Sequence, residues 1–357
     1  MCYRIHTINN MQNGWYKMSN NTIKDVASKA GISTATVSRY LNSSGYVSKE
    51  TQAKIAKVIE DLDFIPNHIA ISLKKTETKT IGIVIPDLSN VSFMDTVKAI
   101  SDVALENGYQ SIILSSDEDI EKENKILDVL VSKRVDGIII VSAGDNGEKI
   151  LKINNKRLPI VLLDRDVCNI GEDIIIDAIV NNNFRGSYEI VNYLISLGHK
   201  KIAILTSNKS PKMINERLNG YVKALADNNM ETNSSYILYG DSKFESGYNL
   251  TKQLIMQPFK PTAIFSVNNI MALGSVSALN EMKIAIPDKM SICAFGEFKY
   301  HAVLNPDMTV ADQQSYNVGK KAAEVLIEKI HNFKNWVPKK IVFDAKIIMR
   351  NSCSRPY

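Results

Sequence analysis

The sequence has little of what marks exported, membrane-spanning or metal-binding proteins. It contains only four cysteines, Cys2, Cys168, Cys293 and Cys353, which form no CxxC pair and no cluster with histidine. This spacing argues against a zinc site, and scattered free thiols indicate a reducing compartment. No run of about 18 apolar residues offers a membrane-spanning helix. Residues 1–20 lack the apolar core of a secretory signal, so we expect a cytoplasmic protein.

Motifs of catalysis are missing as well. The chain has no GxGxxG, no GxxxxGKS/T and no GxSxG, and its five histidines are isolated from one another. We therefore expect no cofactor, no bound metal and no enzymatic activity. An enzyme remains a minor alternative, because doubly wound folds often host one.

Positive charge is concentrated near the start of the chain. Residues 1–80 contain eleven Lys and Arg but six Asp and Glu, and eleven minus six is the whole net charge of +5. The remaining residues are balanced. Such asymmetry is typical of a nucleic-acid-binding head on a neutral body.

The first 79 residues divide into three parts. Residues 1–20 are Asn-rich and unpatterned, so we expect a disordered extension, with translation starting at Met1 or at Met18. Residues 21–65 predict three short helices, because their apolar positions recur at helical spacing. Residues 66–79 contain a proline and a polar TETK stretch, and they predict a linker that includes a short hinge helix.

From Ile81 onward, apolar runs alternate with amphipathic helical segments. The runs are IGIVIP, QSIILS, DGIIIVS, PIVLLD, KIAILT, YILYG, TAIFSV, SICAF and IVFDAKIIM. Such alternation predicts parallel strands joined by helical crossovers, and nine strands are many for one open sheet. We therefore expect a two-lobed α/β body of doubly wound parallel sheets over residues 80–350, with a ligand cleft at the strand ends. Lobe one is expected at about 80–178 and 310–338, and lobe two at about 179–309 and 339–350.

Residues 22–42, TIKDVASKAGISTATVSRYLN, place two short helices on either side of a glycine. Thr22 and Ser33 can cap the helices, and Gly31 can end the first one in a left-handed conformation. The outer face of the second helix then carries short side chains and one arginine. That composition suits the major groove of DNA. A generic helical hairpin with a solvated polar face is the alternative.

This stretch resembles the DNA-binding head of the lactose-repressor family of bacterial regulators. The next segment, VSKETQAKIAKVIEDLDFIPNHIAISLKK, is similar to the third helix and hinge of that family. Further motifs follow in the family's order: IGIVIPDLSN, VDGIIIVSA, PIVLLDRDV, LISLGHKKIAIL, ERLNGYVKAL, SVNNIMALG and NPDMTVADQ. The resemblance covers residues 20–350. It implies a small all-α helix-turn-helix head, a hinge and a periplasmic-binding-protein-like body.

The resemblance assigns DNA contacts to the head and hinge. Bases would be contacted by Thr34, Ala35 and Arg39. Phosphates would be held by Thr22, Ser33, Thr36, Ser38 and Asn42. The minor groove would receive the hinge residues Asn67, Ala70, Leu73 and Lys74. Leu73 would wedge between base pairs, at a cost of about a few kcal/mol in unstacking; an ordinary buried leucine is the alternative.

The resemblance also implies a small-molecule effector, a sugar or a purine, in the cleft between the lobes. The matching positions are Asp87, Asn90, Asp164, Arg217 and Asn268. Salt bridges are the alternative role for Arg217 and Asp164. The chain departs from the family where relatives tend to carry an acid, at Asn182, Asn269 and Gly296, and where some carry an arginine, at Asn305. The resemblance therefore does not identify the effector.

Taken together, these features predict a transcriptional regulator, most simply a repressor, that binds a palindromic operator. Its expected partners are double-stranded DNA, a small-molecule effector and a second copy of the chain, with no membrane. No Leu-rich heptad segment follows the last strand run, which favours a dimer over a tetramer. The alternative is a two-lobed sugar-binding protein without DNA function. The basic head and the missing export signal argue against it.

Overall fold

The computed structural model describes most of the chain in two compact units that divide after residue 76. The described residues are 21–42, 44–64, 77–88, 90–144, 146–169, 173–208, 211–299, 301 and 305–356. The expected extension 1–20 lies outside them, as does most of the expected linker 66–79. The predicted hinge contacts outside the described residues are Asn67, Ala70, Leu73 and Lys74. Below, "head" means residues 21–42 and 44–64, and "body" means the described residues from 77 onward.

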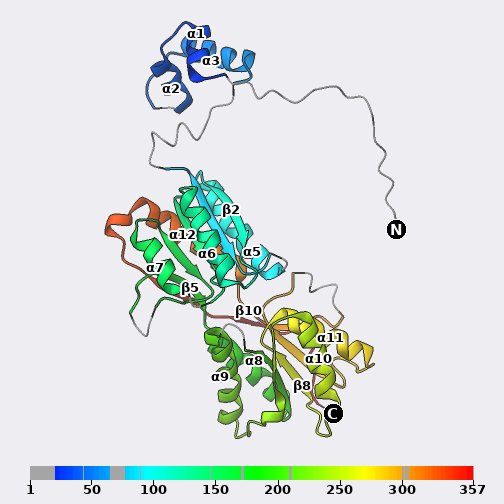
Figure 1. Cartoon of the computed structure of the whole chain (residues 1–357). Coiled ribbons are helices and arrows are strands. Elements are labelled where there is room, and N and C mark those ends of the chain that lie inside the picture. The colour runs from blue at the N-terminus through cyan, green and yellow to red at the C-terminus, as the bar shows by residue number, and fades with distance from the viewer. Residues whose placement is uncertain are drawn as a thin grey trace, which may run out of the picture. The chain divides into compact units, whose positions relative to one another are not determined.

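The head consists of three helices around a small apolar core. They are α1 (Ile23–Ala30), α2 (Thr34–Asn42) and α3 (Lys49–Asp61), drawn in blue in Figure 1. Val26, Val37 and Ile55, one from each helix, are fully buried and pack in one cluster. Burying a side chain of this size stabilises a fold by about 1.5–3 kcal/mol. A few such contacts therefore hold the three helices together.

A glycine and a serine set the turn between α1 and α2. Gly31 has a φ of 64°, a left-handed conformation that costs a glycine little. The Ser33 hydroxyl accepts a hydrogen bond from the backbone N–H of Thr36 at 3.1 Å, which caps the start of α2. The predicted helix-turn-helix is confirmed.

The body begins with a six-stranded parallel sheet, which forms lobe one. Its strand order is β11-β5-β4-β3-β1-β2. The strands are β1 (Thr80–Ile85), β2 (Gln110–Ser115), β3 (Gly137–Ile140), β4 (Ile160–Leu163), β5 (Asp177–Asn181) and β11 (Lys340–Phe343). One face is covered by α5 (Val91–Glu106) and α12 (Ser315–His331), and the other by α6 (Ile120–Ser132) and α7 (Gly147–Asn155).

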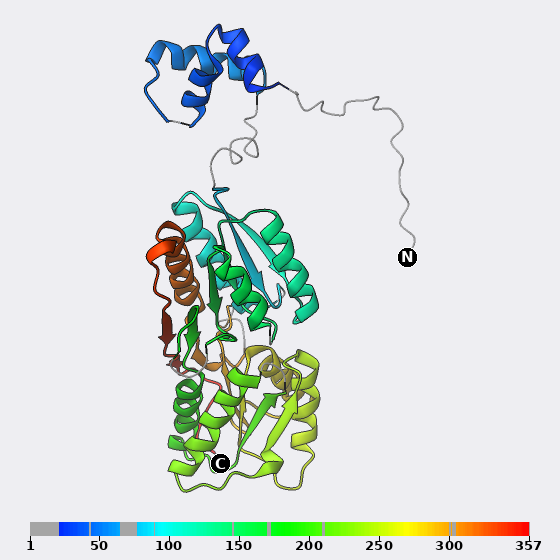
Figure 2. The ribbon, with the colours of Figure 1, turned by 60° about the vertical axis from the view of Figure 1, so that its left-hand side comes forward.

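Lobe two repeats this architecture (Figure 2). Its strand order is β12-β10-β9-β8-β6-β7, with β12 antiparallel to β10. The strands are β6 (Ile202–Ser207), β7 (Ile237–Gly240), β8 (Ala263–Ser266), β9 (Ser291–Phe295), β10 (Thr309–Asp312) and β12 (Lys346–Ile348). Helices α8 (Asn183–Ser196) and α9 (Pro211–Asp227) cover one face, and α10 (Phe244–Ile255) and α11 (Asn269–Glu281) the other. Two short 3₁₀ helices are η1 (Ser234–Tyr236) and η3 (Phe333–Asn335).

The chain passes between the lobes three times, and the crossing points differ from the expected boundaries. Strand β5 completes the first sheet, so lobe one runs to about Asn181 rather than 178. Strand β10 pairs with β9, which places residues 309–312 in lobe two. Strand β11 pairs with β5 and returns residues 340–343 to lobe one. The chain leaves a lobe only after its last strand there has paired with the sheet of that lobe. A local run of apolar residues does not reveal with which sheet a strand pairs, so the sequence did not fix the crossing points.

Candidate functional site

The outer side of α2 presents a short, polar surface. Thr34, Ala35 and Arg39 are exposed, whereas Val37 on the opposite side is fully buried. These are the three residues that the sequence predicts to face DNA bases. Within the described head, Lys29 and Asp61 form an ion pair at 3.8 Å, whereas Arg39 forms no ion pair there. The guanidinium of Arg39 is therefore available to an outside acceptor.

The residues predicted to hold phosphates gather at the starts of the two helices. The backbone N–H of Thr22 donates to the Asp25 carboxylate at 2.6 Å, and the Thr22 hydroxyl donates to it at 2.7 Å. The hydrogen bonds from Thr22 lower the pKa of Asp25. The hydroxyls of Ser33 and Thr36 lie 2.9 Å apart at the start of α2.

Two predicted phosphate contacts lie further along α2. Ser38 is half-buried on this helix, and the side chain of Asn42 lies outside the described residues. The N-terminal amides of α2 and the hydroxyls around them form the kind of surface on which phosphates bind.

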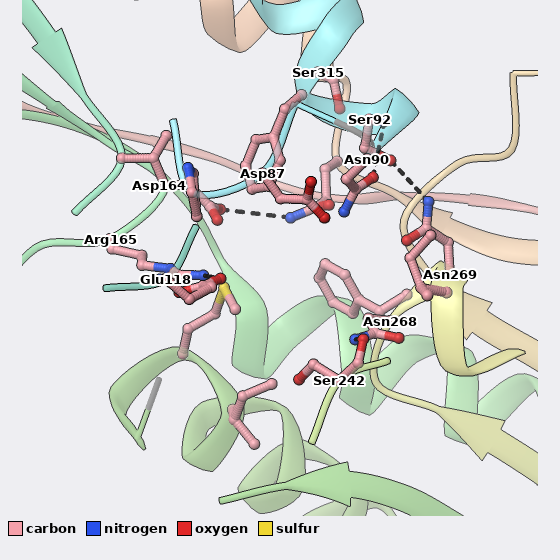
Figure 3. A pocket seen from close by; sticks show the side chains of 18 of the residues that line it. Asp87, Asn90, Ser92, Glu118, Asp164, Arg165, Ser242, Asn268, Asn269 and Ser315 are labelled. Carbon is pink, nitrogen blue, oxygen red and sulfur yellow. Dashed lines mark hydrogen bonds and ion pairs between the residues drawn. The ribbon is translucent and has the colours of Figure 1, made fainter. Parts of the chain in front are cut away.

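A cavity of about 580 Å³ lies between the two lobes of the body. All five predicted effector residues line it: Asp87, Asn90, Asp164, Arg217 and Asn268. Asp87, Asp164 and Asn268 follow the carboxyl ends of β1, β4 and β8, where parallel sheets bind ligands. Figure 3 shows Asp87, Asp164, Ser242 and Asn268 around this space. The volume falls within the range of about 300–1,000 Å³ that small-molecule sites occupy.

Arg217 is held at the wall of the cavity by three neighbours. Its Nε donates to Asn183 Oδ1 at 2.8 Å, and its Nη1 donates to the carbonyl of Val267 at 2.6 Å. The guanidinium carbon lies 3.7 Å from the ring centroid of Phe295. Nη2 has no hydrogen-bond partner among the described residues, although Arg217 is only 2% exposed. Burial lowers the pKa of Arg217 to about 10, so it remains a cation at neutral pH.

Asp164 sits in a strained backbone conformation directly after β4. Its φ is 59°, in the left-handed region that non-glycine residues seldom adopt. Its backbone N–H donates to the carbonyl of Ile179 at 2.8 Å, which fixes the residue at the sheet edge. Gln313 Nε2 approaches its Oδ1 at 3.5 Å. The carboxylate is thereby oriented at the cavity and keeps acceptor capacity for a ligand.

Asn90 and Asn268 have structural tasks as well as places in the cavity wall. The Oδ1 atom of Asn90 accepts the backbone N–H of Ser92 at 3.1 Å, at the start of α5. Asn268 caps α11 in the same way by accepting from Met271 at 2.8 Å, and its Nδ2 donates to the carbonyl of Ser242 at 3.1 Å. These bonds leave the two amides less capacity for a ligand than the predicted role suggests.

The structure adds residues that the sequence reasoning did not find. Arg165 lines the cavity and forms a two-pronged ion pair with Glu118, with both N–O distances 2.7 Å. Phe93, Phe244 and Phe295 contribute aromatic side chains to the lining. The position of Arg165 immediately after Asp164 at a strand end was an available signal. The pairing with a glutamate 47 residues away was not.

Two polar contacts join lobe one to lobe two, one in the cavity lining and one outside it. The amide of Asn269, in lobe two, donates to the Ser92 hydroxyl of lobe one at 2.9 Å. Lys299 of lobe two pairs with Asp95 of lobe one at 2.8 Å. A ligand that changes the lobe angle must therefore alter these contacts.

Family models match both parts of the chain. Residues 22–67 match the model described as bacterial regulatory proteins of the lacI family. Residues 78–348 match the model described as periplasmic binding proteins and sugar binding domain of the LacI family. The chain belongs to the lacI family. It is thus a transcriptional regulator with a DNA-binding head and a ligand-binding body.

Individual members of the lacI family agree with this assignment. The HTH-type transcriptional repressor PurR of Actinobacillus pleuropneumoniae is 32% identical over 332 residues, 93% of this chain and 98% of the relative. The lac repressor dimer bound to operator and the anti-inducer ONPF has a TM-score of 0.82 at 24% identity, covering 94% of this chain and 99% of that one. The regulator CelR in complex with cellobiose has a TM-score of 0.70 at 22% identity, covering 93% and 99%. The similarity to these two solved structures shows that the chain shares their fold.

Two of the positions at which the chain departs from the lacI-family pattern, Gly296 and Asn182, have structural explanations. Gly296 has a φ of 95°, which suits glycine. The carboxylate of the next residue, Glu297, forms a two-pronged ion pair with Arg350 at 2.6 and 2.9 Å. Asn182 caps α8 by accepting the N–H of Arg185 at 3.1 Å. The side chains of Glu297 and Asn182 therefore form hydrogen bonds and ion pairs within the protein and stabilise its fold.

The described residues offer neither a metal site nor a membrane-spanning helix. Within the described residues, no group of His, Cys, Asp and Glu side chains has the arrangement of a metal site. None of the described helices combines the length and apolar character that crossing a membrane requires.

Proposed function

We propose that this chain is a transcriptional repressor that binds a palindromic operator as a homodimer. Each copy would place α2 in the major groove of one half-site. The observation that carries the proposal is the exposed face of α2, where Thr34 and Ala35 are short and Arg39 is free of ion pairs within the described head. Short side chains let the helix backbone approach the base edges, and the guanidinium fork matches O6 and N7 of guanine.

The phosphate contacts would come from the helix starts and the hinge. Thr22, Ser33 and Thr36 present hydroxyls beside the helix N-termini, and Ser38 and Asn42 follow along α2. Such contacts position the head on the duplex without selecting a sequence. The hinge role of Asn67, Ala70, Leu73 and Lys74 stays part of the proposal, with Leu73 as the minor-groove wedge.

The interlobe cavity would receive the effector that controls operator binding. Asp87, Asp164 and Arg217 supply charged groups there, and the Asn269–Ser92 hydrogen bond joins the two lobes within its lining. An effector changes DNA affinity only if it binds the DNA-competent and DNA-incompetent states with different affinities. We further propose that the protein acts in the cytoplasm, where the DNA lies, and that it binds its effector without converting it chemically.

The proposal is tested by selecting binding sites from random double-stranded DNA with the full-length protein. We expect a two-fold symmetric sequence to be enriched, since two identical heads read two half-sites. Sedimentation of the protein with the enriched duplex should give two chains per duplex. Enrichment of no sequence, at a salt concentration that still permits binding, would rule the proposal out.

A further inference from the structure

Two of the four cysteines, Cys293 and Cys353, come together in lobe two although they belong to different segments of the sequence. We propose that these two residues form a reversible disulfide when the protein meets a hydroperoxide. The bond would fasten the C-terminal segment, residues 349–356, to strand β9. This modification is independent of DNA binding and of the interlobe cavity.

Hydrogen bonds already hold the C-terminal segment against β9. The backbone N–H of Ile292 donates to the carbonyl of Ser352 at 2.9 Å. The Ser352 hydroxyl donates in return to the carbonyl of Ile292 at 2.6 Å. Cys293 and Cys353 each follow one of these two bonded residues in the sequence. The fold therefore brings the two cysteines together before any reaction takes place.

The sulfur of Cys353 lies against the backbone beside Cys293. The Cys353 thiol donates to the carbonyl of Ile292, with a distance of 3.2 Å between sulfur and oxygen. That carbonyl belongs to the peptide unit that contains the nitrogen of Cys293. Both side chains pack in the same apolar cluster, and the Cys293 thiol donates a hydrogen bond to the sulfur of Cys353. A disulfide requires side chains that point toward each other, which this thiol contact supplies.

The surroundings of the two sulfurs assign them different roles. Cys353 is half-buried, and the hydrogen bond from Cys293 lowers the pKa of the Cys353 thiol. Cys293 is fully buried, and burial raises the pKa of its thiol well above the ordinary value. The accessible thiolate is the form of cysteine that reacts with a hydroperoxide. Cys353 is thus the attacking residue, and Cys293 is the residue that resolves the product.

The reaction needs the two thiols and the hydroperoxide as its oxidant. The Cys353 thiolate attacks one oxygen of the hydroperoxide, the O–O bond breaks, and the leaving oxygen takes up a proton. Cys353 is then a sulfenic acid. The sulfur of Cys293 next attacks the sulfur of Cys353, and the hydroxyl group leaves as water with the proton of the Cys293 thiol. The two thiols have lost two electrons, which the hydroperoxide has gained.

Cys168 provides an internal comparison. It is buried in an apolar cluster of lobe one, where burial raises the pKa of its thiol to about 12. Neither Cys293 nor Cys353 belongs to that cluster. A buried thiol of this kind is inert toward oxidants, so Cys168 should stay reduced while the pair in lobe two reacts.

Peptide mapping in the absence of reductant tests the proposal. The full-length protein is freed of reductant, treated with a small excess of hydrogen peroxide, blocked at its free thiols and digested. We expect a cross-linked peptide pair that contains Cys293 and Cys353 as the main oxidation product, and we expect a thiol reductant to remove it. A main product cross-linked through Cys168 would overturn the proposal. So would a Cys353 that is oxidised to a sulfinic acid without a cross-link, or thiols that all stay reduced.

Two serine variants attribute the product to the pair. Cys353→Ser keeps the size of the side chain but removes the attacking sulfur, so the cross-link should disappear. Cys168→Ser is the matched control and should form the cross-link as the unmodified protein does. A Cys168→Ser variant without the cross-link would contradict the assignment of the reacting pair.

The fastening itself is measured by urea unfolding of the oxidised and the reduced protein. The bond closes a loop of about 60 residues, which restricts the unfolded chain. We therefore expect oxidation to shift the unfolding midpoint of the body to a higher urea concentration in the unmodified protein and to leave it in place in Cys353→Ser. A midpoint of the unmodified protein that stays or falls on oxidation would contradict the claim that the bond fastens the C-terminal segment.

Discussion

Arg217 stacks on Phe295 with its guanidinium carbon 3.7 Å from the ring centroid, and this contact joins α9 to the end of β9 at the cavity wall. The planar cation is thereby fixed before any ligand arrives, with Nη2 as its one nitrogen without a partner among the described residues. Pre-organisation of this kind improves affinity because little conformational freedom is lost on binding.

The first prediction concerns this stacked arginine. Arg217→Lys keeps the charge but loses the planar fork and the stacking. Because a hydrogen bond to a charged group contributes about 1.5–3 kcal/mol, we expect binding of a ligand in the interlobe cavity to weaken by about ten- to a hundredfold. Calorimetric titration measures the change. Arg185→Lys, at an exposed ion-paired position on α8, is the control and should bind normally. Equal affinities of the two variants would contradict the assigned role.

The second prediction separates the head from the body. Ile55 is fully buried in the head, so Ile55→Ala should destabilise that small unit by about 2–5 kcal/mol. We expect specific DNA binding to be lost while the thermal transition of the body is unchanged. Val342→Ala, at a side chain 52% exposed on β11, serves as the control and should affect neither. A parallel loss of body stability in Ile55→Ala would show that the two units do not unfold independently.

The third prediction concerns pH and the buried His199. Its Nε2 lies 2.9 Å from the carbonyl of Ser354, to which it must donate, and its Nδ1 lies 2.8 Å from the Thr262 hydroxyl, from which it accepts. Burial lowers the pKa of His199 below its ordinary value of about 6.5. The unfolded chain therefore binds the proton more readily, and the contribution of His199 to stability is complete above pH about 6.5 and is lost as the pH falls below it.

This pH dependence is measured by chemical unfolding of the body at neutral and mildly acidic pH. His199→Gln retains hydrogen-bonding groups but does not titrate. We expect the drop in the free energy of unfolding between pH about 7.5 and about 5.5 to be smaller in the variant than in the unmodified protein. An equal or larger drop in His199→Gln would assign the pH dependence to other groups.

The fourth prediction concerns salt. If hydroxyls, helix N-termini and basic residues of the head hold phosphates, binding releases counterions from the DNA. The logarithm of the association constant should then fall linearly with the logarithm of the salt concentration, with a slope of about −0.9 per neutralised phosphate. Fluorescence anisotropy on the selected duplex gives the slope. A slope near zero would exclude the phosphate contacts proposed for the head.

The sequence was most informative where local pattern determines structure. The glycine turn at Gly31, the cap at Ser33 and the inward Val37 follow from local spacing, and the structure contains all three. Asp87 and Asp164, which follow strand ends, line the cavity because parallel strands bring their carboxyl ends together, and their role in binding an effector stays a prediction.

Features that depend on pairing between distant segments could not be predicted. Strands β5 and β10, with sequences DAIVN and TVAD, are too short and too polar at their ends to stand out as apolar runs. The lobe boundaries were misplaced for that reason. The Arg165–Glu118 pair and the Arg217–Phe295 stack join residues far apart in sequence. The caps formed by Asn90 and Asn268 show that a residue in a cavity wall can also serve the fold.

The most direct test of the account is the base preference of the Arg39→Ala variant. The unmodified protein, Arg39→Ala and Arg355→Ala are titrated against the selected palindrome and all its symmetric single-base variants. Arg355 is an exposed residue of the body, outside the head, and its replacement by alanine removes the same charge as Arg39→Ala. We predict that Arg39→Ala binds about 1–3 kcal/mol more weakly and loses preference at one base position per half-site, while Arg355→Ala keeps the full profile. An Arg39→Ala variant with undiminished preference at every position would contradict the claim that α2 reads the operator.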